Sequence, residues 1–120
     1  MSSLAGKTVI VTGASKGIGA ATAHAVIKAG ARLIAHYGND RAGVEKATSF
    51  ARDGQVTLLK AEFSDMDAVD AFWSQALKAA GGYIDVLVNN AGMIDSKSIL
   101  DLDLEDYDHI FNVNSRAPFM

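Results

Sequence analysis

Hydrophobic and polar positions along the chain follow two kinds of pattern. Apolar runs without polar alternation are typical of strands covered on both faces, and they occupy residues 7–12, 31–37, 55–61 and 84–88. Between and after these runs, apolar residues recur at the helical period. This spacing predicts helices over residues 18–29, 40 to about 52, 64–80 and from about 104 onward, with a loop over residues 89 to about 102.

Strands that alternate with helices favour a parallel sheet with helices on both faces. The pattern therefore predicts an α/β fold, a Rossmann-type doubly wound parallel sheet. Right-handed crossovers and a switch point after the first strand give the strand order 3-2-1-4. With four strands, this sheet would be incomplete.

The helix boundaries and faces can also be predicted. Asp40 is expected to cap the second helix, and Ser64 with Asp67 resembles a capping box at the start of the third. Asp65 is interpreted as a helix-start residue rather than a ligand. The inner face of the first helix is expected to carry Ile18, Ala21, Ala25, Val26 and Ala29. That of the third helix is expected to carry Val69, Phe72, Trp73, Ala76, Leu77 and Ala80.

Composition narrows the function classes. The 120 residues correspond to one domain or part of one, with 49% hydrophobic and 21% charged residues. A net charge of −3 gives no electrostatic basis for binding nucleic acid or an anionic membrane. The absence of cysteine excludes disulfides and thiolate chemistry, and the histidines lack metal-site spacing, so no metal is predicted. Without a signal peptide or a membrane-length apolar run, the expected location is cytoplasmic.

A glycine loop follows the first strand directly and leads into the first helix. Gly13, Gly17 and Gly19 give the spacing G-x-x-x-G-x-G. Such a loop lets backbone N–H groups and a helix N-terminus meet a pyrophosphate. Gly13 would allow the tight turn, Gly17 the approach of the phosphates, and Gly19 close packing of helix on sheet. The alternative is a glycine turn that binds nothing.

Three motifs together resemble the short-chain dehydrogenase/reductase family. They are the segment TGASKGIG at residues 12–19, the segment NNAG at residues 89–92, and Asn114 within the segment NVN. The resemblance implies a nicotinamide dinucleotide across the carboxyl ends of the strands, with Ser15, Lys16 and Ile18 joining the glycines around it. It also implies that Asn114 is a catalytic residue that holds a water in a proton relay. A core asparagine with satisfied hydrogen bonds is the alternative for Asn114.

The resemblance assigns further residues to the cofactor. In the NNAG segment, Ala91 and Gly92 would leave space for the adenosine side, and Asn90 would bond the cofactor or tie strand four to its neighbour. The alternative is a turn at the strand end that binds no ligand. Family members often have an aspartate after strand three that meets the adenine. The matching position here is Glu62, followed by Phe63, so either the longer acid or the Phe63 backbone would serve.

The end of the second strand predicts the choice between the two cofactors. A carboxylate there would bind the ribose 2′-OH and repel a 2′-phosphate. This chain has Tyr37 followed by Gly38, and Lys16 and Arg41 supply positive charge nearby. NADP(H) is therefore predicted over NAD(H), unless the two cations are merely solvated.

The family's Tyr-x-x-x-Lys pair does not occur in these residues, because Arg41, Leu87 and Phe111 stand four positions after the three tyrosines. We therefore expect residues 1–120 to be one dinucleotide-binding domain, cut within the helix that carries Asn114. The expected parent is an oxidoreductase that interconverts a small-molecule carbonyl and an alcohol, as a homodimer or homotetramer. The chain alone would be inactive. The alternative function is a non-catalytic nucleotide-binding or interaction fragment.

Overall fold

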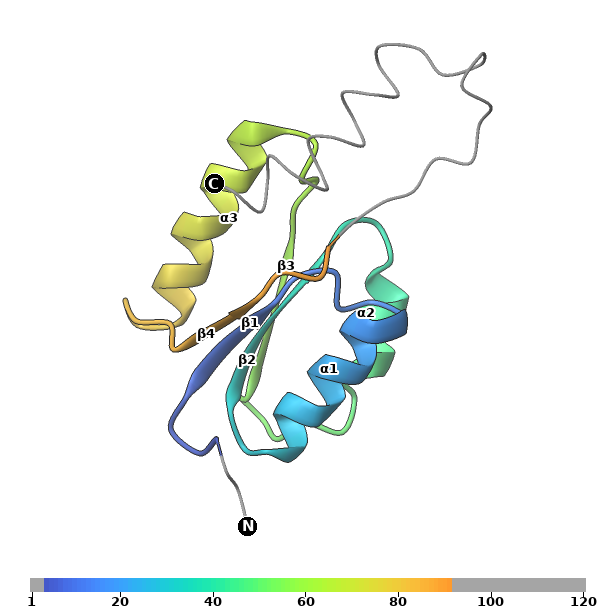
Figure 1. Cartoon of the computed structure of the whole chain (residues 1–120), viewed down its shortest axis with the longest axis vertical. Coiled ribbons are helices and arrows are strands. Elements are labelled where there is room, and N and C mark those ends of the chain that lie inside the picture. The colour runs from blue at the N-terminus through green and yellow to red at the C-terminus, as the bar shows by residue number, and fades with distance from the viewer. Residues whose placement is uncertain (1–3, 92–120) are drawn as a thin grey trace.

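The computed structural model describes residues 4–91, which form a parallel sheet flanked by helices (Figure 1). In chain order the elements are β1 (Thr8–Val11), α1 (Gly17–Lys28), β2 (Arg32–Tyr37), α2 (Arg41–Ala47), β3 (Val56–Lys60), α3 (Met66–Ala79) and β4 (Val86–Val88). Three predictions lie outside the described residues: the contact of Gly92, the helix from about 104, and the role of Asn114.

The sheet has the order β3-β2-β1-β4, and every neighbouring pair is parallel. This confirms the predicted α/β fold and its strand order. Val11 stands opposite both Ala35 of β2 and Val88 of β4, so the carboxyl ends of these three strands lie close together. In Figure 1 these ends lie on the upper side of the sheet, where α1 begins.

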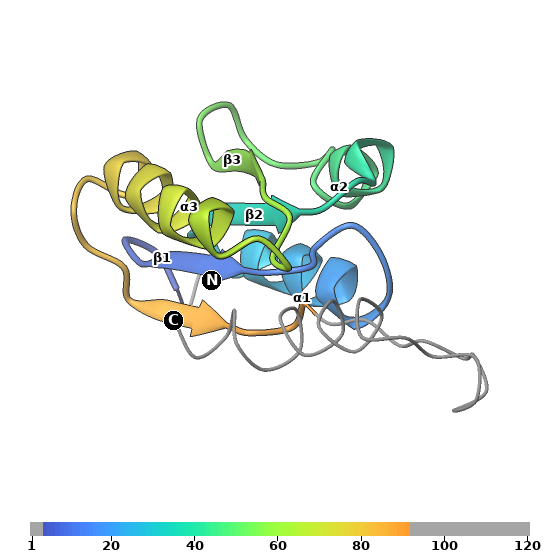
Figure 2. The same ribbon diagram turned by 90° about the horizontal axis from the view of Figure 1, so that it is seen from above.

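The helices divide between the two faces of the sheet. In Figure 1, α3 lies to the left of the strands, and α1 and α2 lie to the right. Seen from above in Figure 2, α3 and α2 lie on the left and right sides of the view. Side chains alternate along a strand, so each face has its own apolar core. One core joins Val9, Val11, Leu33 and Ala35 to Ala23, Val26, Ile27 and Val44; the other joins Ile10 and Ile34 to Phe63, Val69, Phe72 and Ala76. β1 is therefore buried on both faces, as predicted.

The inner face of α1 differs from the predicted one. Its buried residues are Gly19, Ala23, Val26 and Ile27, whereas the Ile18 side chain is 78% exposed. Val26 is buried as predicted, but the rest of the predicted face was wrong by about one position along the helix. A predicted stripe that began at Ile18 placed the large apolar side chain inside, but the first turn packs on the glycine loop through Gly19, which has no side chain.

The fourth strand also differs from its prediction. β4 is shorter than residues 84–88, and Val86 and Leu87 are 42% and 39% exposed, so it is not a buried strand within the described residues. β4 pairs with β1 along one edge and forms the end of the described sheet. The apolar run therefore predicted the presence of this strand correctly, but the prediction that the strand is buried was wrong.

Two helix ends were also predicted incorrectly. α2 ends at Ala47 rather than near residue 52, because the Thr48 hydroxyl donates to the Val44 carbonyl and its backbone leaves the helical region. α3 is capped by Asp65, whose carboxylate accepts from the Asp67 N–H at 3.0 Å, and not by Ser64. Asp40 caps α2 as predicted, accepting from the Gly43 N–H at 2.8 Å. None of the helices within residues 4–91 is long and apolar enough to cross a bilayer.

Candidate functional site

The glycine loop reverses the chain between β1 and α1. Gly13 and Gly17 have φ values of +65° and +60°, a region that favours glycine. Lys16 is the extended N-cap residue of α1, and its side chain does not cap the helix. The helix therefore opens with backbone N–H groups that its own structure leaves without a carbonyl partner.

The three glycines meet different surroundings. A Cβ on Gly13 would lie 2.9 Å from the Ala91 Cα, and a Cβ on Gly19 would overlap the Gly13 carbonyl oxygen. A Cβ on Gly17 would meet nothing within 4 Å. Gly13 and Gly19 are thus required for packing within the protein, whereas Gly17 keeps an open space at the start of α1.

Thr12 joins the loop to the end of β4. Its hydroxyl donates to the Val88 carbonyl at 3.3 Å and accepts from the N–H groups of Asn90 and Ala91 at 2.9 and 3.0 Å. One donor and two acceptor sites are all that a hydroxyl offers, so every one is used. The Asn90 side chain then donates to the Gly13 carbonyl at 3.1 Å. Asn90 therefore ties strand four to its neighbour, which was one of its two predicted roles.

His36 joins the loop to the end of β2. The Gly13 N–H donates to the ring Nδ1 at 2.9 Å, and the Ala14 N–H donates to the His36 carbonyl at 2.9 Å. The ring Nε2 lies 2.8 Å from the Ala61 carbonyl oxygen beyond β3. Two loop N–H groups are therefore directed into the protein. In the first turn of α1, the N–H groups of Gly17, Ile18 and Gly19 have no carbonyl partner within the helix.

Positive charge that follows the carboxyl ends of β1 and β2 comes from two residues, Lys16 in the loop and Arg41 at the start of α2. Lys16 is exposed and belongs to the loop itself. Arg41 donates from Nε to the Glu45 carboxylate at 2.7 Å and from a terminal nitrogen to the Tyr37 hydroxyl at 2.9 Å. These hydrogen bonds, first to Glu45 and then to Tyr37, raise the pKa of Arg41. Glu45 offsets the Arg41 charge, so Lys16 supplies the less compensated cation.

Tyr37 lies at the end of β2 as predicted, but its side chain is buried in the core beside α1 and α2. Gly38, the next residue, has a backbone that a side chain tolerates, and a Cβ there would meet nothing within 4 Å. A side chain that approaches a ligand from this strand end would therefore come from position 38 rather than from position 37.

The end of β3 holds the two residues predicted near the adenine. The exposed Glu62 carboxylate accepts from the Ser64 N–H and hydroxyl at 3.2 and 3.0 Å. The Phe63 ring is buried and stacks on His36, with ring centroids 3.9 Å apart. Both side chains therefore already have partners within the protein. The Phe63 ring belongs to the core and is not available to contact a ligand.

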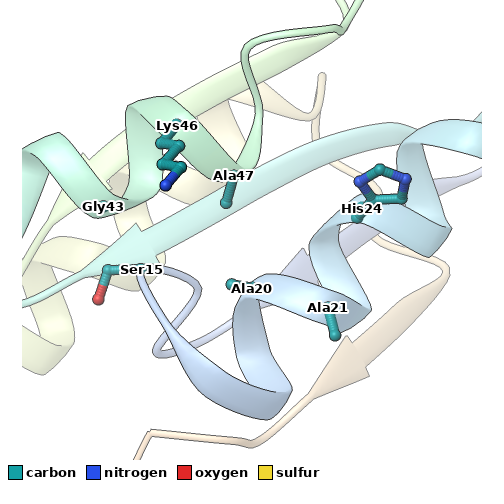
Figure 3. A pocket seen from close by; sticks show the side chains of 7 residues that line it. All are labelled: Ser15, Ala20, Ala21, His24, Gly43, Lys46 and Ala47. Atoms are coloured by element: carbon teal, nitrogen blue, oxygen red, sulfur yellow. The ribbon is translucent and has the colours of Figure 1, made fainter.

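A pocket of about 500 Å³ lies between α1 and α2 (Figure 3). Its lining comprises Ser15, Ala20, Ala21, His24, Gly43, Lys46 and Ala47. Of the predicted cofactor residues it includes only Ser15. It is thus separate from the inner side of the loop, where Gly13 meets Asn90 and Ala91.

Sequence reasoning missed the two residues that hold the loop in place. Of His36 it noted only that the histidines lack metal-site spacing, and it did not single out Thr12. The available signal was a polar side chain within or at the end of an otherwise apolar strand, since buried polar groups need partners. The identity of those partners depends on strand pairing and was not available from local pattern.

Comparison with known proteins identifies the family. Residues 7–120 match the family model described as short chain dehydrogenase, and the chain belongs to this family. It is 35% identical over 118 residues to versicolorin reductase from Emericella nidulans, covering 97% of this chain and 44% of that protein. It is 34% identical to a chloroplastic NADPH-dependent aldehyde reductase-like protein from Arabidopsis thaliana, covering 98% of this chain and 48% of that protein.

A solved structure agrees with the fold. A short chain dehydrogenase from Burkholderia cenocepacia, in complex with NADP, superimposes with a TM-score of 0.87 at 34% identity. The alignment covers 98% of this chain and 48% of that one. The chain thus spans about half the length of the relatives that it matches.

Proposed function

We propose that this chain is the dinucleotide-binding part of an NAD(P)-dependent oxidoreductase that interconverts a small-molecule carbonyl and an alcohol. The bound nicotinamide would supply the hydride. In the chain itself, Gly13, Ser15, Lys16, Gly17, Ile18 and Gly19 would hold the pyrophosphate and adenosine ribose. Asn90, Ala91 and Gly92 would line the adenosine side, with Glu62 or the Phe63 backbone near the adenine.

One observation carries the proposal: the opening at Gly17. The N–H groups of Gly13 and Ala14 donate to His36. The N–H groups of the first turn of α1 lie beside Gly17, where an added Cβ would meet nothing within 4 Å. Backbone donors at a helix N-terminus favour a phosphate group. The opening lies at the carboxyl ends of parallel strands, next to the switch from β1 to β4, where ligands of open α/β sheets bind.

We also propose a preference for NADP(H). Lys16 offers an exposed ammonium, and Gly38 places no carboxylate at the end of β2 to repel a 2′-phosphate. Arg41 adds less, because Glu45 offsets its charge. Two of the relatives support this preference, since their names or structures include NADPH or NADP.

The remaining parts of the proposal concern residues outside those described and the whole protein. Asn114 would act in proton transfer by holding a water, as the family resemblance implies. The domain assignment to residues 1–120, a dimeric or tetrameric assembly and a cytoplasmic location stay predictions. No nucleic-acid or membrane partner is proposed.

A matched pair of glycine substitutions tests the binding site. Gly17 and Gly54 both have positive φ, and a Cβ would meet nothing within 4 Å at either position. Each Gly→Ala change should therefore cost about 1–2 kcal/mol of stability through the backbone. Only Gly17→Ala places a methyl group where the pyrophosphate would lie, because Gly54 is in the turn before β3, at the amino ends of the strands rather than at their carboxyl ends.

We expect Gly17→Ala to weaken the binding of NADP⁺ by about tenfold or more, measured by calorimetric titration of the protein at its natural length. Gly54→Ala should bind as the unmodified protein does. Equal affinities for both variants, or a larger loss for Gly54→Ala, would contradict a phosphate site at Gly17.

A further inference from the structure

The ring of His36 is a buried bridge between three segments of the chain. It is 3% exposed, and it connects the Gly13 N–H to the carbonyl of Ala61. A carbonyl can only accept, so Nε2 carries the hydrogen. A backbone N–H can only donate, so Nδ1 carries none. Both bonds form together in one protonation state only, the neutral ring with hydrogen on Nε2.

We propose that His36 in this neutral form is a positioning residue that holds the glycine loop in its dinucleotide-binding shape, and that protonation of its ring weakens dinucleotide binding at acid pH. The inference rests on the proposed function and adds to it a residue that lies behind the loop.

The position of Gly13 explains how a residue behind the loop can act on its ligand face. The Gly13 N–H is held by His36, and its carbonyl is held by the Asn90 side chain. The same carbonyl lies against Gly19, so closely that a Cβ on Gly19 would overlap it. A shift of Gly13 would therefore reach the first turn of α1, where the N–H groups that would bind phosphate begin.

Aromatic packing holds the His36 ring in place in addition to its two hydrogen bonds. Phe63 stacks on His36 with an interplanar angle of 7°, and Phe72 from α3 meets it edge-on at 5.2 Å. The ring therefore has little room to rotate and exchange its partners. A substitution that keeps the aromatic contact but lacks the nitrogens can separate packing from hydrogen bonding.

Protonation would place a second hydrogen on Nδ1, directly against the Gly13 N–H. Two donors would then face each other, and the bond to the loop would be lost. Burial lowers the pKa of His36 below its ordinary value of 6.5, while the bond to Ala61 and the charge of Glu62 oppose this shift. Among the described residues packed on the ring, β1 and α3 contribute backbone and aromatic groups, and Glu62 beyond β3 contributes the charge. Full binding is therefore expected above pH 6.5, with loss below it.

Two variants separate the roles of His36. In His36→Asn, the side-chain oxygen lies as many bonds from Cα as Nδ1 does, so it can accept from Gly13 but cannot titrate. In His36→Phe, the stacking with Phe63 and Phe72 is kept and both nitrogens are lost. At about pH 7.5, we expect NADP⁺ to bind about tenfold more weakly to His36→Phe, and within about threefold of the unmodified protein to His36→Asn.

The same titrations carried down to about pH 5 test protonation. The 2′-phosphate of the ligand also gains a proton near pH 6, and this change affects all proteins alike. Affinity should therefore fall further for the unmodified protein than for His36→Asn. A ¹⁵N spectrum at neutral pH should show Nε2 protonated and Nδ1 unprotonated, and the Gly13 amide should exchange faster with solvent in His36→Phe.

Three results would overturn the inference. The first is unchanged affinity of His36→Phe at neutral pH. The second is the same loss of affinity with acid in the unmodified protein and in His36→Asn. The third is a protonated Nδ1 at neutral pH. Each of these can arise in a protein that binds NADP⁺, so it leaves the proposed function intact. A protein that binds no dinucleotide at any pH would instead contradict the proposed function and, with it, this inference.

Discussion

At the scale of single residues, position 38 offers a test of the proposed cofactor preference. Gly38 directly follows β2, its backbone conformation is one that other residues adopt, and a Cβ there would meet nothing within 4 Å. Tyr37 is unsuitable for introducing a charge, because its side chain is buried. A carboxylate at position 38 can therefore be added at the strand end without disturbing the core.

Gly38→Asp should reverse the cofactor preference. The new carboxylate would repel a 2′-phosphate and accept a hydrogen bond from a ribose 2′-OH, lowering affinity for NADP⁺ about tenfold relative to NAD⁺. The measurement is the ratio of the two dissociation constants. Gly38→Asn, of the same shape without the charge, is the control, and it should leave the ratio near that of the unmodified protein. An unmodified protein that already prefers NAD⁺ would contradict the role given to Lys16.

His36 also makes the stability of the protein depend on pH. Burial lowers its pKa in the folded state below 6.5, so the unfolded chain binds more protons as the pH falls through this range. Stability contributed by the neutral ring is complete above pH 6.5 and is lost between 6.5 and the lower folded-state pKa.

Denaturant unfolding from about pH 7.5 to about pH 5 measures this effect. The free energy of unfolding should fall with acid, and the fall should be smaller in His36→Asn, which has no titrating ring. An equal fall in both proteins would assign the pH dependence to other groups.

At the scale of elements, helix starts depend on which side chain reaches a backbone N–H. Asp65 caps α3 by accepting from the Asp67 N–H. Asp65→Ala should therefore lower the free energy of unfolding by about 1 kcal/mol. Asp70 is an exposed residue within the same helix, and Asp70→Ala should leave stability unchanged or raise it, because alanine is the better helix former. Equal losses for the two variants would show that Asp65 is not the cap.

The sequence predicted the type and order of every described element, because hydrophobic period and glycine position are local signals. It was less successful where the answer depended on neighbours. The predicted buried face of α1 was displaced from the observed one, because the Gly13 carbonyl fills the space beside Gly19. The exposure of β4 was not predicted, because it depends on what covers the edge of the sheet. The glycine loop was predicted from its spacing, whereas its supports, Thr12 and His36, act through contacts made only after the strands pair.

At the scale of the whole molecule, the strand order assembles the proposed site. β2 and β4 lie on either side of β1, so His36 and Asn90 meet the loop after β1 from opposite sides. The site that we propose for catalysis also involves Asn114, which lies outside the described residues. An amide does not supply a proton at neutral pH, and the Tyr-x-x-x-Lys pair that the family resemblance implies does not occur in residues 1–120, so we expect these residues alone to lack the acid that carbonyl reduction needs.

Residues 1–120 alone should therefore not oxidise NADPH with ketones or aldehydes. The assay is absorbance of NADPH over time with a panel of such carbonyl compounds and a purified chain of verified mass. Turnover that disappears in Asn114→Ala would contradict this expectation, because it would mean that the chain already contains a complete catalytic site.

Dinucleotide binding at the first turn of α1 can be measured by an amide-resolved ¹H–¹⁵N titration of the protein with NADP⁺. We expect the largest shifts at the amides of Gly17, Ile18 and Gly19, with smaller shifts at Gly54. Shifts concentrated in the pocket between α1 and α2, or no shifts at saturating NADP⁺, would contradict it.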